Sequence, residues 1–415
     1  MSNYEYNFFQ RRISGGDVFV VFDNNGENAA KKALQQLPFD FSTLKNKRVL
    51  VKPNAGRLVD PNLGINTGPS VVAGVLDFLI DQGLENVSVG DSPILGVKAL
   101  DALEKSGIAE VAKKRNIPLV DLDAEKPVVI DVPEPKVTPT LKICRKVLEA
   151  DFVISVPVMK THMHTQVSLG LKNMKGCLYH REKVRLHQLP PLEKQESRTK
   201  PLDMAIAELS KLLIPDLTVV DGIIGQEGLG PSAGSPKPLG AVVASRNCLA
   251  ADRTAAQLMG LDPAKIFHLV LAEKEILNTG VYPDYVPGEY RVFPKDYCSR
   301  TAAFEPPPEK MSIEFENVKV EDKDSCSACL STVLMFLKRY YDEFADYFSA
   351  EDPMRLALGK AIGPQKKKTL IIGNCAIQRK DDGIFIKGCP PVASDILKAM
   401  REAGLIREDI PLNDK

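Results

Sequence analysis

The stretch ADFVISVPVMKTHMHTQVSLGLKNMKG, residues 150–176, decides how the rest of the chain is interpreted. Its first nine residues form a near-continuous apolar run, which is typical of a central strand covered on both faces of a parallel sheet. Six polar side chains fit for an anion follow at once: Lys160, His162, His164, Lys172, Asn173 and Lys175. Ligands of open α/β sheets bind beyond the carboxyl ends of the strands. We therefore predict a carboxylate or phosphate site at this strand end.

The two histidines allow a second interpretation. His162 and His164 alternate, so in an extended segment they share a face and could simply hydrogen-bond a loop. Histidine can also act as an acid, a base or a metal ligand. Because the charges gather at a strand end, we predict a functional role, in which Lys160, His162, His164 and Lys172 bind or protonate a substrate.

Short β-rich runs and helical patterns alternate through the first two-thirds of the chain. Further strands are expected at 17–23, 48–54, 215–225 and 239–245. Residues 68–83 have apolar side chains at helical spacing and end on a glycine. This alternation predicts a layered α/β domain with a mostly parallel sheet and helices on both faces.

The pattern changes after residue 262. We predict an α/β domain over residues 1–262, a connector rich in proline and tyrosine over 263–310, and a small cysteine-containing α+β module over 311–415. A length of 415 residues favours such a division.

Other strand ends add candidate residues. Lys52 and Asn54 follow the strand at 48–54 and, with Asn173 and Lys175, are predicted to bind the substrate. TGPS at 67–70 could open a helix whose amides bind an anion, or Thr67 could cap that helix. Asp221 and Glu227 follow the strand at 215–225 and are predicted as a base or an orienting group. GQEGLGPSAG is expected to be a loop and matches neither a Walker A motif nor a dinucleotide fingerprint.

Composition and charge exclude several classes of protein. Lysine plus arginine and aspartate plus glutamate are equal at 54 each, which argues against a nucleic-acid binder. The N-terminus lacks a signal-peptide pattern and no apolar run is long enough to span a membrane, so we expect a cytoplasmic protein. In that compartment structural disulfides are not expected among its 8 cysteines.

Four late cysteines have the spacing of a metal site. Cys326 and Cys329 form C-x2-C, and Cys375 and Cys389 follow in glycine-containing turns. The first pair lies at an expected helix start, where backbone amides favour thiolates. Four thiolates suit tetrahedral zinc or an iron–sulfur cluster, and a dithiol is a third reading.

Two resemblances bear on these alternatives. GNCAI and GCPPVASDIL are similar to the cluster-binding subunits of complex I and nickel–iron hydrogenases, where such turns each supply a ligand to a 4Fe–4S cluster. Residues 49–263 resemble the family catalogued as domain of unknown function 362, many of whose members carry an iron–sulfur module. The resemblance implies one 4Fe–4S cluster on Cys326, Cys329, Cys375 and Cys389, with zinc as the alternative.

Three functions follow from these features. The favoured one is an iron–sulfur oxidoreductase of anaerobic chemistry, which acts on a small anionic substrate and takes electrons from a donor such as a ferredoxin. The cluster would be redox-active or act as a Lewis acid. The second is an electron-transfer or redox-sensing protein, and the third is a cluster-independent isomerase or racemase with a structural metal. No nucleic-acid or membrane partner is expected.

Overall fold

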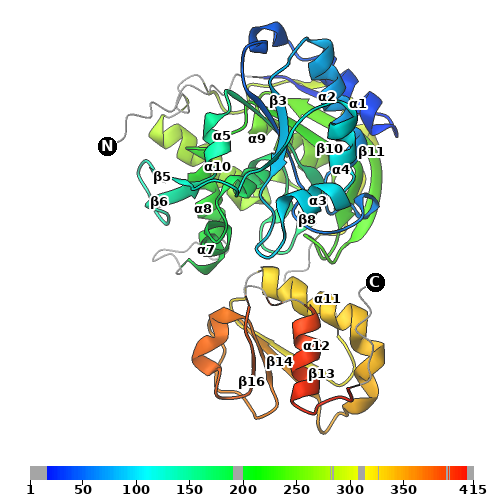
Figure 1. Cartoon of the computed structure of the whole chain (residues 1–415), viewed down its shortest axis with the longest axis vertical. Coiled ribbons are helices and arrows are strands. Elements are labelled where there is room, and N and C mark those ends of the chain that lie inside the picture. The colour runs from blue at the N-terminus through cyan, green and yellow to red at the C-terminus, as the bar shows by residue number, and fades with distance from the viewer. Residues whose placement is uncertain are drawn as a thin grey trace. The chain divides into compact units, whose positions relative to one another are not determined.

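The structure, a computed structural model, describes residues 16–189, 200–280, 282, 285–306, 314–325, 327–388, 391 and 393–408. The chain forms two compact units, Met1–Pro306 and Pro307–Lys415 (Figure 1). Residues 263–306, assigned to a connector from the sequence, belong to the first unit. They include α10 (Phe267–Thr279) and β12 (Val292–Phe293). Within the described ranges, no helix combines the length and apolarity needed to cross a bilayer.

The first unit is built on a mostly parallel sheet, as predicted. Its main strands are β1 (Val18–Phe22), β2 (Val49–Pro53), β3 (Val87–Asp91), β4 (Leu119–Asp121), β7 (Phe152–Val156), β10 (Leu217–Glu227), β11 (Ser235–Ser245) and β12. They lie in the order β12-β1-β11-β10-β7-β2-β3-β4. Along this order only β11 runs antiparallel to its neighbours. The carboxyl ends of β2, β3, β7 and β10 therefore meet at one edge of the sheet.

Helices cover both faces of this sheet. One face packs against α1 (Gly26–Gln35), α2 (Pro69–Asp81), α3 (Ala99–Lys105) and α4 (Ile108–Lys114). The other packs against α5 (Arg145–Glu149), α6 (Gly170–Asn173), α8 (Pro201–Ser210), α9 (Cys248–Leu258) and α10. In β7, Phe152 and Ile154 face the first set and Val153 faces the second. This alternation explains why the strand has an uninterrupted apolar sequence.

A second strand continues beyond β7. After Pro157 the chain enters β8 (Val158–His162), which pairs in parallel with the outer part of β10 and antiparallel with β9 (Gln166–Ser168). Lys160 and His162, expected beyond the end of a strand, both lie in β8. This second strand forms because the long strand β10 offers it a partner beyond the sheet edge.

The glycine-rich stretch after β10 was also misread in part. Residues 225–227, expected in a loop, still belong to β10, which pairs with β11 as far as Glu227. A Cβ at Gly225 would lie 2.5 Å from the carbonyl oxygen of Met159 and 2.9 Å from the Phe304 ring. Gly225 therefore permits close packing inside a strand instead of marking a turn.

The second unit has its own four-stranded sheet. The strands β13 (Val318–Asp322), β14 (Met354–Leu358), β15 (Leu370–Ile372) and β16 (Ile384–Ile386) lie side by side in chain order, and all their pairings are parallel. Two helices accompany them, α11 (Ser327–Phe344) and α12 (Ala393–Glu402). Both bury apolar side chains, among them Phe336 and Tyr340 in α11 and Leu397 in α12. This separate unit carries the cysteine motifs.

Candidate functional site

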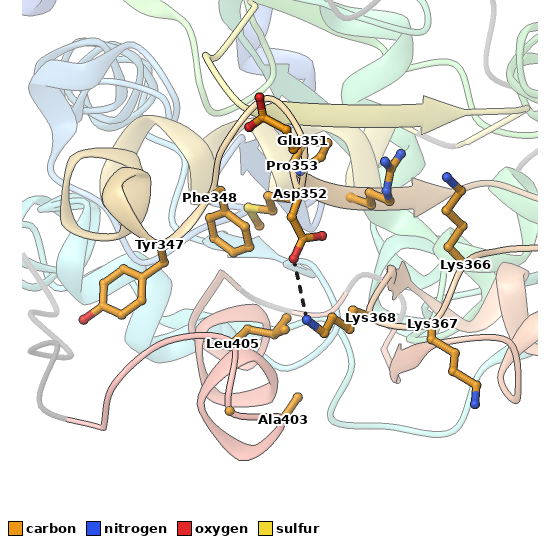
Figure 2. Close-up of a pocket in the computed structure, with 13 residues that line it drawn as sticks. Tyr347, Phe348, Glu351, Asp352, Pro353, Lys366, Lys367, Lys368, Ala403 and Leu405 are labelled. Carbon is orange, nitrogen blue, oxygen red and sulfur yellow. Dashed lines mark ion pairs between the residues drawn. The ribbon is translucent and has the colours of Figure 1, made fainter.

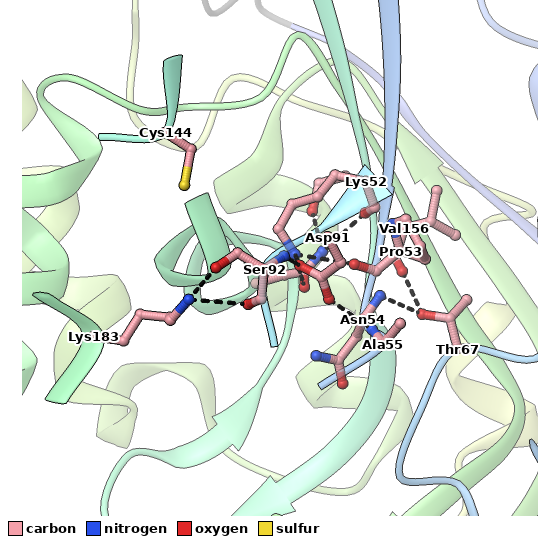
Figure 3. Close-up of polar contacts among 12 residues, drawn as sticks. Lys52, Pro53, Asn54, Ala55, Thr67, Asp91, Ser92, Cys144, Val156 and Lys183 are labelled. Carbon is pink, nitrogen blue, oxygen red and sulfur yellow. Dashed lines mark hydrogen bonds and ion pairs between the residues drawn. The ribbon is translucent and has the colours of Figure 1, made fainter. Parts of the chain in front are cut away.

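A buried ion pair joins the ends of β2 and β3. Lys52 Nζ lies 2.6 Å from Asp91 Oδ1, and the two side chains are 0% and 2% exposed. Figure 3 shows both side chains at the strand ends, together with Ala55, whose amide donates to Asp91 Oδ2 at 2.7 Å. Lys52 also donates to Asn173 Oδ1 at 2.9 Å. Lys52 and Asn173, both predicted to bind substrate, are therefore bonded to each other at the ends of β2 and β3.

Lys160 lies beside this pair and is also buried. Its ammonium group donates to Asn54 Oδ1 at 2.7 Å and to the carbonyl oxygen of Ile65 at 2.6 Å. These acceptors are uncharged. Burial, followed by the charges of Lys172 and Arg57, holds the pKa of Lys160 well below its usual range. The fold has thus brought several positive charges together around one buried lysine.

His162 is held as a neutral imidazole. Burial lowers its pKa far below the ordinary value, and the nearby charge of Lys172 lowers it further. The backbone amide of His164 donates to His162 Nδ1 at 3.2 Å, so this nitrogen is an acceptor. The proton of the neutral ring is thereby assigned to Nε2. His162 can offer a hydrogen bond to a ligand oxygen, as neutral catalytic histidines do. His164 is half-buried, and its carbonyl oxygen accepts from Lys200.

Two cations of the site make no direct ion pair among the described residues. Neither the Lys172 ammonium nor the Arg57 guanidinium makes a hydrogen bond or ion pair within the part of the chain that the structure describes. Both side chains are half-buried. Burial lowers the pKa of Lys172 to about 8, opposed by the charge of Asp203, and it lowers that of Arg57 to about 10. Burial without a partner is unfavourable for a cation, which indicates that an anion belongs there.

Arg57 was not predicted as a site residue. It lies in the loop between β2 and α2, and its carbonyl oxygen accepts from Asn66 Nδ2 at 2.7 Å. The available signal was its position, three residues after Asn54 in a glycine-containing loop that follows a strand end.

The basic segment HREKVRLHQ, residues 180–188, docks on the same edge. Lys183 contacts Ser92 Oγ (Figure 3). Its ammonium group also lies 3.3 Å from Asp123 Oδ2. Lys175 contacts His187 Nε2. The segment is therefore not a freely solvated helix face, because Lys183 contacts residues that follow β3 and β4, and His187 contacts Lys175.

Asp221 and Glu227 bind parts of the protein itself. Asp221 Oδ2 accepts from the amide of Gly68 at 2.7 Å, at the start of α2, and burial raises the pKa of Asp221 to about 6. Glu227 accepts from the amide of Glu305 at 2.9 Å and pairs with Lys237 at 3.1 Å. Neither makes a recorded contact with Lys160 or His162, and their predicted catalytic roles stay predictions.

Thr67 does not cap α2, and the amide of Gly68 is already occupied. Thr67 Oγ1 donates to the carbonyl oxygen of Val156 at 2.6 Å and accepts from the amide of Asn54 at 2.8 Å. Thr67 therefore ties the loop to β7.

The cysteine turns of the second unit converge. A Cβ at Gly373 would lie 2.8 Å from Cys329 Sγ, so the thiol rests directly against this glycine (φ +88°). The amide of Asn374 donates to the carbonyl oxygen of Gly388 at 2.8 Å, and the amide of Gly388 donates back to Asn374 Oδ1 at 2.9 Å. These contacts hold together the start of α11 and the two turns.

Two of the four predicted cysteine ligands lie in this arrangement. Cys329 is buried in the first turn of α11, and Cys375 is half-buried after β15. Cys326 and Cys389 lie outside the described residues. Among the residues that are described, no group of three or more metal-binding side chains occurs. The structure thus brings the segment of Cys329 next to the turn that carries Cys375, and the cluster on all four cysteines stays a prediction.

The second unit also has a polar pocket (Figure 2). Its lining includes Tyr347, Phe348, Lys366 and Lys367. Lys368 Nζ and Asp352 Oδ2 are 3.6 Å apart across it, and both side chains are mostly exposed. Exposed pairs of this kind contribute little, so we assign no function to the pocket.

Comparisons with known proteins place the first unit in a family. A thylakoid-associated protein of Synechocystis sp. is 30% identical over 231 residues, which are 56% of this chain and 68% of that protein. The cytoplasmic location expected from the sequence stays a prediction.

Two solved structures align at low similarity. The lactate racemase apoprotein of Thermoanaerobacterium thermosaccharolyticum aligns with a TM-score of 0.37 and 14% identity, and a Thermotoga maritima protein aligns with 0.34 and 15%. The alignments cover 61% and 56% of this chain, and the chain spans 58% of each of the two structures. The model of the domain of unknown function DUF362 matches residues 49–257, half of the chain, and the chain belongs to this family.

Proposed function

We propose that the first unit is an enzyme domain that binds a small carboxylate or phosphate compound at the carboxyl ends of β2, β3 and β8 and transfers protons on it. The observation that carries this proposal is the positive charge of Lys172 and Arg57 beside buried Lys160, since neither of the two cations makes a direct ion pair in the described part of the chain. An anion that accepts hydrogen bonds from these groups would compensate their charge.

The side chains would divide the chemistry among them. Lys172, with its pKa lowered to about 8, can gain or lose a proton near neutral pH and is our candidate for the general acid or base. His162 would donate from Nε2 to a ligand oxygen. Lys160 and Lys52 would hold Asn54 and Asn173 in position around the bound molecule.

Titration calorimetry of the full chain with succinate and with inorganic phosphate tests this proposal. We expect binding of at least one probe, and an affinity about tenfold or more lower for Lys172→Met, because a charged hydrogen-bond donor is lost. Lys114→Met is the matched control, since Lys114 lies on the exposed face of α4 and pairs with Glu110. Equal affinities of the wild type and Lys172→Met would contradict the proposed site.

We further propose that the second unit binds one 4Fe–4S cluster through Cys326, Cys329, Cys375 and Cys389. The contact of Cys329 with Gly373 and the paired turns at Asn374 and Gly388 support it. Such a cluster would supply electron transfer, with a ferredoxin-like donor as the proposed partner, or a Lewis-acid iron.

Iron, acid-labile sulfide and zinc per chain test the cluster after anaerobic purification. We expect iron and sulfide together, with both lost in Cys329→Ser and Cys375→Ser. Cys298→Ser is the control, because Cys298 is exposed in the first unit. One zinc without sulfide would replace the cluster by a structural zinc site.

A further inference from the structure

Three polar side chains form a row across adjacent strands of the site. Lys160 in β8 is the register partner of Gln226 in β10 and of Ser168 in β9. Side chains of directly opposed residues in neighbouring strands point to the same face of a sheet. Lys160 is therefore flanked on both sides by an uncharged hydrogen-bonding group.

The two flanking groups lack partners. Neither the Nε2 nor the Oε1 atom of Gln226 has a hydrogen bond within the described parts of the chain, although this side chain is 0% exposed. The buried Oγ of Ser168 is likewise without a partner there. Buried polar atoms nearly always have a hydrogen-bond partner in native proteins. Buried polar atoms without a partner on both sides of Lys160 therefore require an explanation.

The fold does not leave Gln226 room to turn away. Gly234 lies directly over it, and a Cβ at that position would come within 2.8 Å of Gln226 Cγ. Thr161 Oγ1, on the next strand, lies 3.4 Å from the Gln226 carbonyl oxygen and 3.0 Å from that of Gly228. Gly234 therefore packs against the Gln226 side chain, and Thr161 lies close to the main chain of the same residue.

The missing partner can be described chemically. The Gln226 amide offers a donor at Nε2 and needs a donor for Oε1, and the Ser168 hydroxyl can do either. A carboxylate or a doubly ionised phosphate ester only accepts hydrogen bonds, so it satisfies Nε2 and leaves Oε1 unpaired. A hydroxyl group next to the anionic group supplies the donor that is missing.

We propose that Gln226 and Ser168 select an anion that carries a hydroxyl group beside its charge, that is, a hydroxy acid or a hydroxylated phosphate ester. This inference rests on the proposed anion site and names its substrate class. Gln226 and Ser168 are assigned as specificity-determining residues, with Lys160 between them holding the loop that borders the site.

Matched pairs of anions test the inference by titration calorimetry on the full chain. Malate is compared with succinate, and glycerol 3-phosphate with propyl phosphate, so that the two pairs separate a carboxylate from a phosphate. We expect the hydroxylated member of at least one pair to bind about tenfold or more tightly, because its absence leaves buried groups unpaired. Gln226→Met should abolish this preference, because the hydroxylated member loses its hydrogen bonds to both amide atoms whereas the deoxy member loses only the one from Nε2.

Controls distinguish recognition from an effect on folding. Thr254→Val removes another buried hydroxyl without a recorded partner, in α9, and should leave the preference unchanged. Circular dichroism verifies that each variant is folded, and Ser168→Ala provides a second, smaller truncation of the row. Equal binding of both members of each pair, or an unchanged preference in Gln226→Met and Ser168→Ala, would overturn the inference while the anion site stands. No binding of any of the four anions would overturn the proposed function itself.

Discussion

The buried pair of Lys52 and Asp91 allows a quantitative test of how the strand ends are held. Lys52→Met removes the charge and keeps most of the apolar stem. It leaves Asp91 with the amides of Ala55 and Ser92, at 2.7 and 2.8 Å, but without the cation at 2.6 Å. Breaking one side of a buried pair costs about 3–5 kcal/mol, so we expect a loss of that size in the opening free energy of the first unit.

Hydrogen exchange of peptides from β2 and β3 across a urea series measures this loss for the first unit alone. The double variant Lys52→Met/Asp91→Asn removes both charges and should recover about 2 kcal/mol or more of the loss. Lys32→Met is the matched control, because Lys32 pairs with Asp23 at 3.1 Å while 59% of its side chain is exposed. Its expected cost is below about 1 kcal/mol.

The double variant decides between this explanation and a simple loss of packing. A double variant no more stable than Lys52→Met would refute the reasoning.

Two further predictions concern the same strand ends. The pKa of Lys172 is about 8, so the affinity for succinate, which stays ionised, should fall as the pH rises through that value. Calorimetry should find no such fall in Lys172→Met. A parallel fall in this variant would show that another group causes the pH dependence. A Cβ at Gly176 would lie 2.8 Å from Lys52 Nζ and 3.0 Å from Asp91 Oδ1, so Gly176→Ala should destabilise the first unit by about 1–3 kcal/mol. Gly56→Ala, whose nearest neighbour would be at 3.8 Å, should cost far less in the same exchange experiment, and equal losses would contradict the steric argument.

The convergence of residues from separate strands could be predicted from the sequence. Lys52, Asn54 and Lys160 each follow or extend a buried apolar strand, and the carboxyl ends of parallel strands meet at one edge. This property of parallel sheets therefore predicts that Lys52 and Lys160, which are more than a hundred positions apart, lie at one site. It also located Asn173, which bonds to Lys52.

Other features depend on partners that no local pattern reveals. Asp221 is bound to Gly68, which lies 153 positions away, and a lone carboxylate after a strand carries no mark of that partner. The glycine-rich run 225–234 predicts a loop, yet Gln226 lies in β10 because β11 pairs with it there. The lack of a direct ion pair for Lys172 among the described residues is likewise a property of the packed chain, because it depends on where the carboxylates of distant segments lie.

The bond between Asp221 and the start of α2 has a consequence for which molecules the crevice can admit. A helix start is a common landing place for phosphate groups, yet here a tethered carboxylate of the chain already occupies the Gly68 amide. Any incoming phosphate would have to compete with the Asp221 carboxylate, which the fold holds next to this amide at every ligand concentration. A phosphate group that reached α2 would therefore have to displace the Asp221 carboxylate from the Gly68 amide before it could bind there.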